Sequence, residues 1–143
     1  DGSVNSVELS RDHRTMTVAA GTEVSFWETA TLTCTKRFKL PVVEANGYGV
    51  NSATLHPERT IFVAGGGNFW VYVHDFETGE ELQCNKGHHG PVYGCRFTPD
   101  GKCYASAGDD GTIRFWTFAE AVEAEKGDAE PGAPATEEPV EAS

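Results

Sequence analysis

The sequence predicts an all-β fold made of three copies of one unit. Three segments, "VNSVELSRDH", "VNSATLHPER" and "VYGCRFTPDG", begin at Val4, Val50 and Val92, so their starts lie 46 and 42 residues apart. Apolar and polar residues alternate within them with the period of two expected of a strand. A turn-forming group ends each segment. Antiparallel strands repeated at this spacing are typical of the blades of a β-propeller.

The third copy shows the strands of one unit most clearly. "VYGCRF" is the first strand, and "TPDG" is a turn in which proline presets φ and glycine accepts a positive φ. "CYASA" is the second strand, "GDDG" the second turn and "TIRFWT" the third strand. The first and second copies each add a fourth strand, "TCTKRFKL" and "EELQCNK". We therefore expect blades at about residues 3–41, 45–86 and 87–117, within a partial propeller that covers residues 1–117.

Residues 118–143 differ from the repeats in composition. They contain eight acidic residues and one lysine, together with many proline, alanine and glycine residues. The segment "FAEAVEAEK" favours a short helix, and the composition beyond Gly127 is typical of disorder. We therefore expect a disordered acidic tail that adds no fourth strand to the third blade.

The charge of the chain excludes some classes of partner. The formal net charge is −11, with 11 Lys and Arg residues against 22 Asp and Glu residues. No basic stripe is present to displace counterions from a polyanion, so we expect no direct binding of nucleic acid. No apolar run is long enough for a membrane helix, so we expect no membrane insertion. The charge is compatible with a basic protein as partner, and we expect the partners to be other proteins.

The third copy resembles the WD-repeat (WD40) family. "GH" opens it, "PDG" and "DGT" form its two turns, and Trp116 ends its third strand. The second copy has His74 and Asp75 where the family has Trp-Asp, and the first copy keeps Trp27 and Glu28. The resemblance implies a WD40 β-propeller, here about three C-terminal blades of a seven-bladed ring. It also implies that N-terminal blades precede this chain and supply the strand that completes the last blade.

Three residues of the third copy have the side chains of a hydrolytic triad. They are His88, Ser106 and Asp110, at spacings of 18 and 4 residues. The WD-repeat resemblance implies instead that they form a structural tetrad with Trp116, bonded in series. A nucleophilic serine would need an open pocket and an oxyanion site, and no "GxSxG" elbow is present. We therefore expect no catalytic residue, and keep a hydrolase that uses His88 and Ser106 as a remote alternative.

Other motifs in the sequence point to structure rather than chemistry. "AGGGN" at residues 64–68 lacks the lysine and the following helix of a phosphate-binding loop, so we expect a tight turn. No acidic or cysteine cluster accompanies His88 and His89, so we expect no metal site and no cofactor. The four cysteines include no CxxC pair and favour reduced thiols, as in a cytosolic or nuclear protein.

Binding residues of a propeller concentrate on the loops at one rigid face. The loop of His88 and the turn of Asp110 leave their blade at the end where the first strands begin. We expect partner-binding residues at this end, and aromatic residues there are the strongest candidates. The candidates are Tyr93, Asp109, Asn51, Tyr48 and Asn5.

Within the WD repeats, residues 3–117 resemble the serine-threonine kinase receptor-associated protein family. The features that carry the resemblance are "LHPE" with "VAGG" in the second copy, then "TGEEL" and "KGHHGP". The resemblance implies a non-enzymatic scaffold of the survival-of-motor-neuron complex, which assembles spliceosomal small nuclear ribonucleoproteins for mRNA splicing. In animals it also implies damping of transforming-growth-factor-β receptor signalling. We expect a cytoplasmic location, with the nucleus as a second one.

One other WD scaffold stays open as an alternative. The WD-repeat subunit of eukaryotic initiation factor three has a similar "GHFGP"-like opening in its last blade. The sequence has "GHHGP" at residues 87–91. A role in translation initiation is therefore the second function that the sequence allows.

Overall fold

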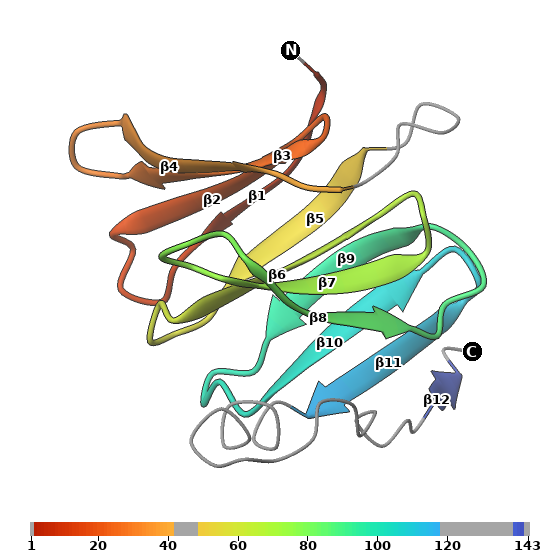
Figure 1. Cartoon of the computed structure of the whole chain (residues 1–143). Helices are drawn as coiled ribbons and strands as arrows, with labels where there is room; N and C mark the ends of the chain where they lie inside the picture. The colour runs from red at the N-terminus through yellow and green to blue at the C-terminus, as the bar shows by residue number, and fades with distance from the viewer. Residues whose placement is uncertain (1, 42–48, 118–138, 142–143) are drawn as a thin grey trace.

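Three antiparallel sheets make up the fold in the computed structural model, which describes residues 2–41, 49–117 and 139–141. Blade 1 contains β1 (Val4–Leu9), β2 (Thr15–Ala20), β3 (Glu23–Glu28) and β4 (Thr33–Lys39). Blade 2 contains β5 (Val50–Leu55), β6 (Ile61–Gly66), β7 (Trp70–Asp75) and β8 (Glu81–Lys86). Blade 3 contains β9 (Val92–Phe97), β10 (Cys103–Gly108), β11 (Thr112–Thr117) and β12 (Pro139–Glu141). Figure 1 shows the three sheets fanned one after another, with β5 next to both β1 and β9.

Two separate cores join the blades. Alternate residues of a strand point to opposite faces of its sheet. Phe62, Tyr72 and their neighbours on one face of blade 2 pack against Phe26 of blade 1. Val71 and Val73 on the other face pack against blade 3, at Tyr104 and other residues. Blade 2 is therefore covered on both faces, as a blade inside a propeller must be.

A β-bulge recurs at the start of the innermost strand of each blade. The register between β1 and β2 shifts at Asn5, and the same shift occurs at Asn51 in blade 2 and at Tyr93 in blade 3. A bulge leaves one residue without a cross-strand partner and re-aims its side chain. Asn5 Nδ2 donates to the Val50 carbonyl over 2.9 Å, and Asn51 Nδ2 donates to the Val92 carbonyl over 3.0 Å. The bulges thus direct two amides across the gap between successive blades.

Two details differ from the sequence-based expectation. Residues 139–141 of the tail form β12, which pairs with β11 from Thr112 to Arg114. A strand at the edge of a sheet presents backbone N–H and C=O groups with which an extended segment can pair. Ala64, Gly65 and Gly66, expected in a tight turn, belong to β6, and the turn begins at Gly67. The helix expected at the start of the tail lies outside the described residues.

Candidate functional site

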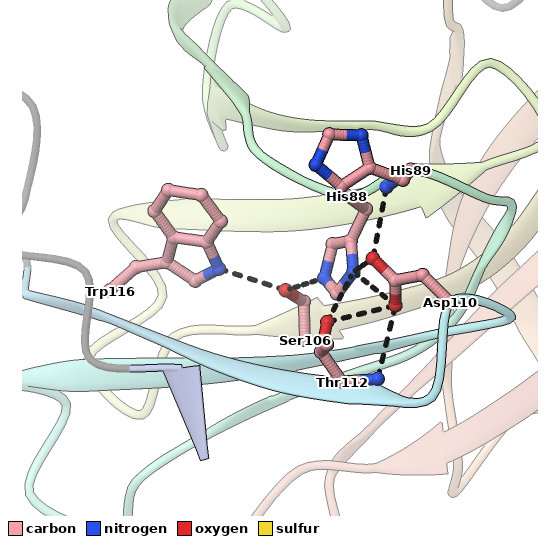
Figure 2. Close-up of polar contacts among 6 residues, drawn as sticks. All are labelled: His88, His89, Ser106, Asp110, Thr112 and Trp116. Carbon is pink, nitrogen blue, oxygen red and sulfur yellow. Dashed lines mark hydrogen bonds and ion pairs between the residues drawn. The ribbon is translucent and has the colours of Figure 1, made fainter. Parts of the chain in front are cut away.

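The structure brings His88, Ser106, Asp110 and Trp116 together in one hydrogen-bonded series (Figure 2). The Trp116 indole N–H donates to Ser106 Oγ over 2.8 Å. Ser106 Oγ lies 2.7 Å from His88 Nε2, and His88 Nδ1 lies 3.1 Å from both carboxylate oxygens of Asp110. With Nδ1 protonated, His88 donates a hydrogen bond to Asp110, and its Nε2 accepts one from the Ser106 hydroxyl. Every polar atom of the series then has a partner.

The end of the blades that holds His88 and Asp110 is set by the strand register. Val50 lies beside Gly66, and Val92 lies beside Gly108, so each innermost strand begins next to the turn between the second and third strands of its blade. We call this end of the molecule the tetrad end. Gly108 is required there, because an added Cβ would lie 2.6 Å from His88 Nδ1.

Asp110 is also held by His89 and Thr112, to which the sequence analysis gave no role in the tetrad. Its carboxylate accepts the His89 N–H over 2.9 Å, the Thr112 N–H over 3.1 Å and the Thr112 hydroxyl over 2.8 Å. Burial raises the pKa of Asp110, but these bonds together with His88 outweigh it and hold the pKa below its usual value. The "DGT" triplet contains a signal for part of this, because an aspartate commonly bonds the backbone two residues on.

Nucleophilic chemistry at Ser106 does not fit its surroundings. Ser106 is 1% exposed and Trp116 is 2% exposed, so the hydroxyl is sealed from any substrate. Its oxygen already receives the Trp116 N–H, which lowers its availability for attack. A hydrolytic serine needs an open approach and separate donors for an oxyanion. What the geometry provides is a closed polar network that fixes the loop before β9 to β10 and β11.

The five candidate partner-binding residues have different surroundings. Tyr93 is 51% exposed, and Asp109 is also exposed at the tetrad end. Asn5 and Asn51 lie at the same end, but each donates its amide to the neighbouring innermost strand. Tyr48 lies outside the described residues. Tyr93 and Asp109 are therefore the candidates whose side chains are accessible to a partner at the tetrad end.

A groove of about 400 Å³ lies at the opposite end, and sequence reasoning did not indicate it. It is formed where the innermost strands of the three blades end, and Leu9, Leu55 and Phe97 occupy equivalent positions in it. Glu8 lines the groove and lies 3.3 Å from Arg96 Nε. Burial raises the pKa of Glu8 despite its hydrogen bond to Thr54 and the charge of Arg96.

Metal and thiol chemistry have little support in the part of the chain that the structure describes. That part holds no group of three or more His, Cys, Asp or Glu side chains that could bind a metal ion. Its four cysteines are free thiols, and burial raises the pKa of Cys95 to about 12, which keeps that thiol protonated at neutral pH. Within the same residues, no helix is long and apolar enough to cross a membrane.

Comparison with known proteins identifies the repeat. Residues 79–117 match the family model "WD domain, G-beta repeat". The "Serine-threonine kinase receptor-associated protein" of Dictyostelium discoideum is 49% identical over 114 residues, which are 80% of this chain and 37% of that protein. "Eukaryotic translation initiation factor 3 subunit I" of Drosophila willistoni is 34% identical over 133 residues, which cover 82% of this chain and 39% of that protein. The chain thus spans well under half the length of these relatives.

The solved structures agree with the arrangement of the blades. "Crystal structure of RRP9 WD40 repeats" superposes with a TM-score of 0.72 over 85% of this chain and 37% of that one. The sequence identity is 15%, so this likeness concerns the fold alone. The chain therefore has the WD40 β-propeller fold, here three blades of a partial ring, and is similar in sequence to serine-threonine kinase receptor-associated proteins.

Proposed function

We propose that the chain is the C-terminal part of a non-enzymatic WD-repeat scaffold that binds other proteins. The closed tetrad is the observation that carries this proposal. The residues most suggestive of catalysis are buried and mutually bonded, so they stiffen blade 3 instead of meeting a substrate. A rigid blade presents its connecting loops in fixed positions, and such loops are where binding residues concentrate.

Further blades of the same propeller are the first partners that we propose. Val7 and Leu9 on the outward side of blade 1 are 52% and 53% exposed, and Phe115 on the outward side of blade 3 is 44% exposed. Each of these sides is a blade face that in blade 2 is buried by a neighbour. A ring of seven blades would bury both, and closure of the sheet edges is how propellers avoid self-association.

The cellular role that we propose is in the survival-of-motor-neuron complex, in assembly of spliceosomal small nuclear ribonucleoproteins. The support is the similarity to serine-threonine kinase receptor-associated proteins over 80% of the chain. The same similarity supports damping of transforming-growth-factor-β receptor signalling where such receptors exist. The corresponding location is the cytoplasm, with the nucleus as a second compartment.

Translation initiation is a second candidate role. The 34% identity to eukaryotic translation initiation factor 3 subunit I favours it, and that similarity covers 82% of the chain. A fold does not by itself determine function, so the WD40 fold is compatible with both proposed roles.

Affinity capture distinguishes the two roles. The protein, expressed from its full coding sequence, is captured from a lysate of its own organism and the bound proteins are identified by mass spectrometry. We expect Gemin and Sm proteins. Initiation-factor subunits without Gemin or Sm proteins would contradict the proposed role and favour the second one.

A further inference from the structure

Blade 2 exposes two aromatic side chains at the tetrad end. Phe69 is 41% exposed and Trp70 is 38% exposed. Other exposed apolar residues, such as Val7 and Phe115, belong to the outward sides of blades 1 and 3, where a further blade would cover them. Blade 2 already has a neighbour on each face. The exposure of Phe69 and Trp70 is therefore not explained by further blades of the ring.

Phe69 also has a backbone conformation that suits glycine. Its φ is 71°, and Gly111 at the equivalent turn position of blade 3 has a φ of 74°. The two turns have the same hydrogen bond, from Phe69 N to the Gly66 carbonyl over 3.3 Å and from Gly111 N to the Gly108 carbonyl over 3.2 Å. A bulky side chain at positive φ is a strained outlier, and such outliers cluster at binding sites. Folding alone would favour glycine here.

A lysine gives the aromatic pair a positive charge. Trp70 and Lys86 are cross-strand partners on β7 and β8, and Lys86 Nζ lies 4.0 Å from the centroid of the Trp70 ring. No carboxylate among residues 2–41, 49–117 and 139–141 forms an ion pair with Lys86. The lysine is also exposed. The patch thus combines two apolar rings with an ammonium group that lacks an acidic partner in the described chain.

We propose that Phe69, Trp70 and Lys86 form a docking patch for a short segment of another protein, in which an acidic residue lies next to an apolar one. The apolar side chain packs on the two rings, and the carboxylate pairs with Lys86. Tryptophan is among the residues most enriched in the hot spots of protein interfaces. The patch deepens the proposed function, on which it rests, by naming a surface and the chemistry of its partner.

Single-stranded RNA is the other ligand class that stacks on aromatic rings. Such binding requires a positively charged groove along the backbone in addition to the rings. The patch has one lysine, and the chain carries a net charge of −11. A short peptide with one carboxylate needs only the local charge of Lys86, so the patch favours such a peptide over a strand with many phosphates.

Peptide titration tests the patch in the protein expressed from its full coding sequence. The probes are fluorescein-labelled peptides of equal length that contain Glu-Phe and Asp-Leu pairs, with matched sets in which Gln and Asn, or Lys, replace the acids. A uridine-rich single-stranded RNA is a further probe. We expect anisotropy to show saturable binding of the acidic peptides, weakened at least about tenfold by Phe69→Gly. Lys86→Gln should reduce the affinity for the acidic peptides more than the affinity for the matched peptides that contain Gln and Asn.

Phe69→Gly separates binding from folding, because it relieves backbone strain and should keep or raise the melting temperature. Leu32→Gly is the matched control. Leu32 has a φ of 54° and is 69% exposed. It lies in the turn between β3 and β4 of blade 1, at the end opposite the tetrad end. It should change stability in the same direction and leave peptide binding intact.

Three results would overturn the patch: no saturable binding of any peptide, equal binding by the Phe69→Gly variant, or preference for the basic peptides or the RNA. The proposed function is tested separately. If Phe69→Gly captures the same partners from lysate as the unchanged protein, the patch is wrong and the scaffold role stands.

Discussion

At the scale of single residues, Asp, His and Ser side chains can form either a catalytic triad or a structural hydrogen-bond network. Their surroundings determine which of the two they form. Asp110, His88 and Ser106 are hydrogen-bonded in the order used by hydrolases. The difference is Trp116, whose N–H occupies the serine oxygen while its ring helps to close the site. A fully satisfied buried polar network rigidifies its surroundings, whereas an unpaired member would be costly.

His74 provides a pH-dependent test of blade 2, where it replaces the tryptophan of blade 3. Its ring is 3% exposed and stacks on Phe62 with the ring centroids 5.1 Å apart. Nδ1 donates to the Gly79 carbonyl over 3.0 Å, and Nε2 has no hydrogen-bond partner among the residues that the structure describes. Burial lowers the pKa of His74, although Gly79 and the charge of Glu81 oppose this. His74 therefore binds a proton less readily in the folded state than in the unfolded state, where the pKa of a histidine is about 6.5.

The unfolding free energy of the unchanged protein should accordingly decrease as the pH falls below about 6.5, and His74→Phe should reduce that decrease. Urea unfolding at several pH values between neutrality and mild acid measures both slopes. An unchanged slope in the variant would show that another group controls the pH dependence.

At the scale of strands and blades, the innermost strands β1, β5 and β9 are joined by side chains rather than by a backbone ladder. Ser52 Oγ accepts the Cys95 N–H over 3.0 Å, in addition to the two asparagine amides that cross the gaps. Blades 2 and 3 approach closely where Gly65 of β6 faces β9. An added Cβ on Gly65 would lie 2.6 Å from Val92 Cγ1 and 3.1 Å from Cys95 Sγ.

Gly65→Ala should therefore destabilise the contact between blades 2 and 3. Overpacking of a tight interface costs about 1–3 kcal/mol. Gly94→Ala is the matched control on β9, because its added Cβ would have an ordinary contact at 3.9 Å with Ala107. Chemical denaturation measures both variants. Equal stability of the two would mean that the blades are less tightly packed than described.

The strands and the tetrad could be predicted from the sequence because both depend on local signals. Alternation and the turn triplets indicate where β9, β10 and β11 begin and end, and the resemblance to the WD repeat implied the bonded series of His88, Ser106, Asp110 and Trp116. Contacts between blades have no such signal. The asparagine amides reach carbonyls more than 40 residues away, and β12 pairs with β11 although no repeat pattern marks residues 139–141 as a strand.

The docking patch was missed for a related reason. "NFWVY" reads as an aromatic strand, and nothing in those letters shows that Phe69 occupies a glycine position. The exposure of Trp70 becomes informative only when both faces of blade 2 are known to be covered. The sequence therefore predicted that binding residues lie at the tetrad end, but it did not indicate the residues of this patch.

At the scale of the whole molecule, the open sides of blades 1 and 3 determine how the chain should behave. The apolar residues on them are the equivalents of residues that are buried in blade 2. Residues 1–143 expressed alone should self-associate, because exposed apolar faces and strand edges promote it. Light scattering coupled to size-exclusion chromatography measures the molar mass and therefore the self-association. A monomer with a sharp, reversible unfolding transition would contradict the account of the open faces.

The most direct test of the central claim, that the tetrad fastens a scaffold blade, is Ser106→Ala in the protein from its full coding sequence. The unfolding free energy is measured, and the unchanged protein is treated with a serine-reactive fluorophosphonate probe. We predict a loss of about 1–3 kcal/mol, because buried partners of Ser106 become unpaired, and no labelling of Ser106. Unchanged stability together with labelling at Ser106 would contradict the account and make the site a hydrolase centre.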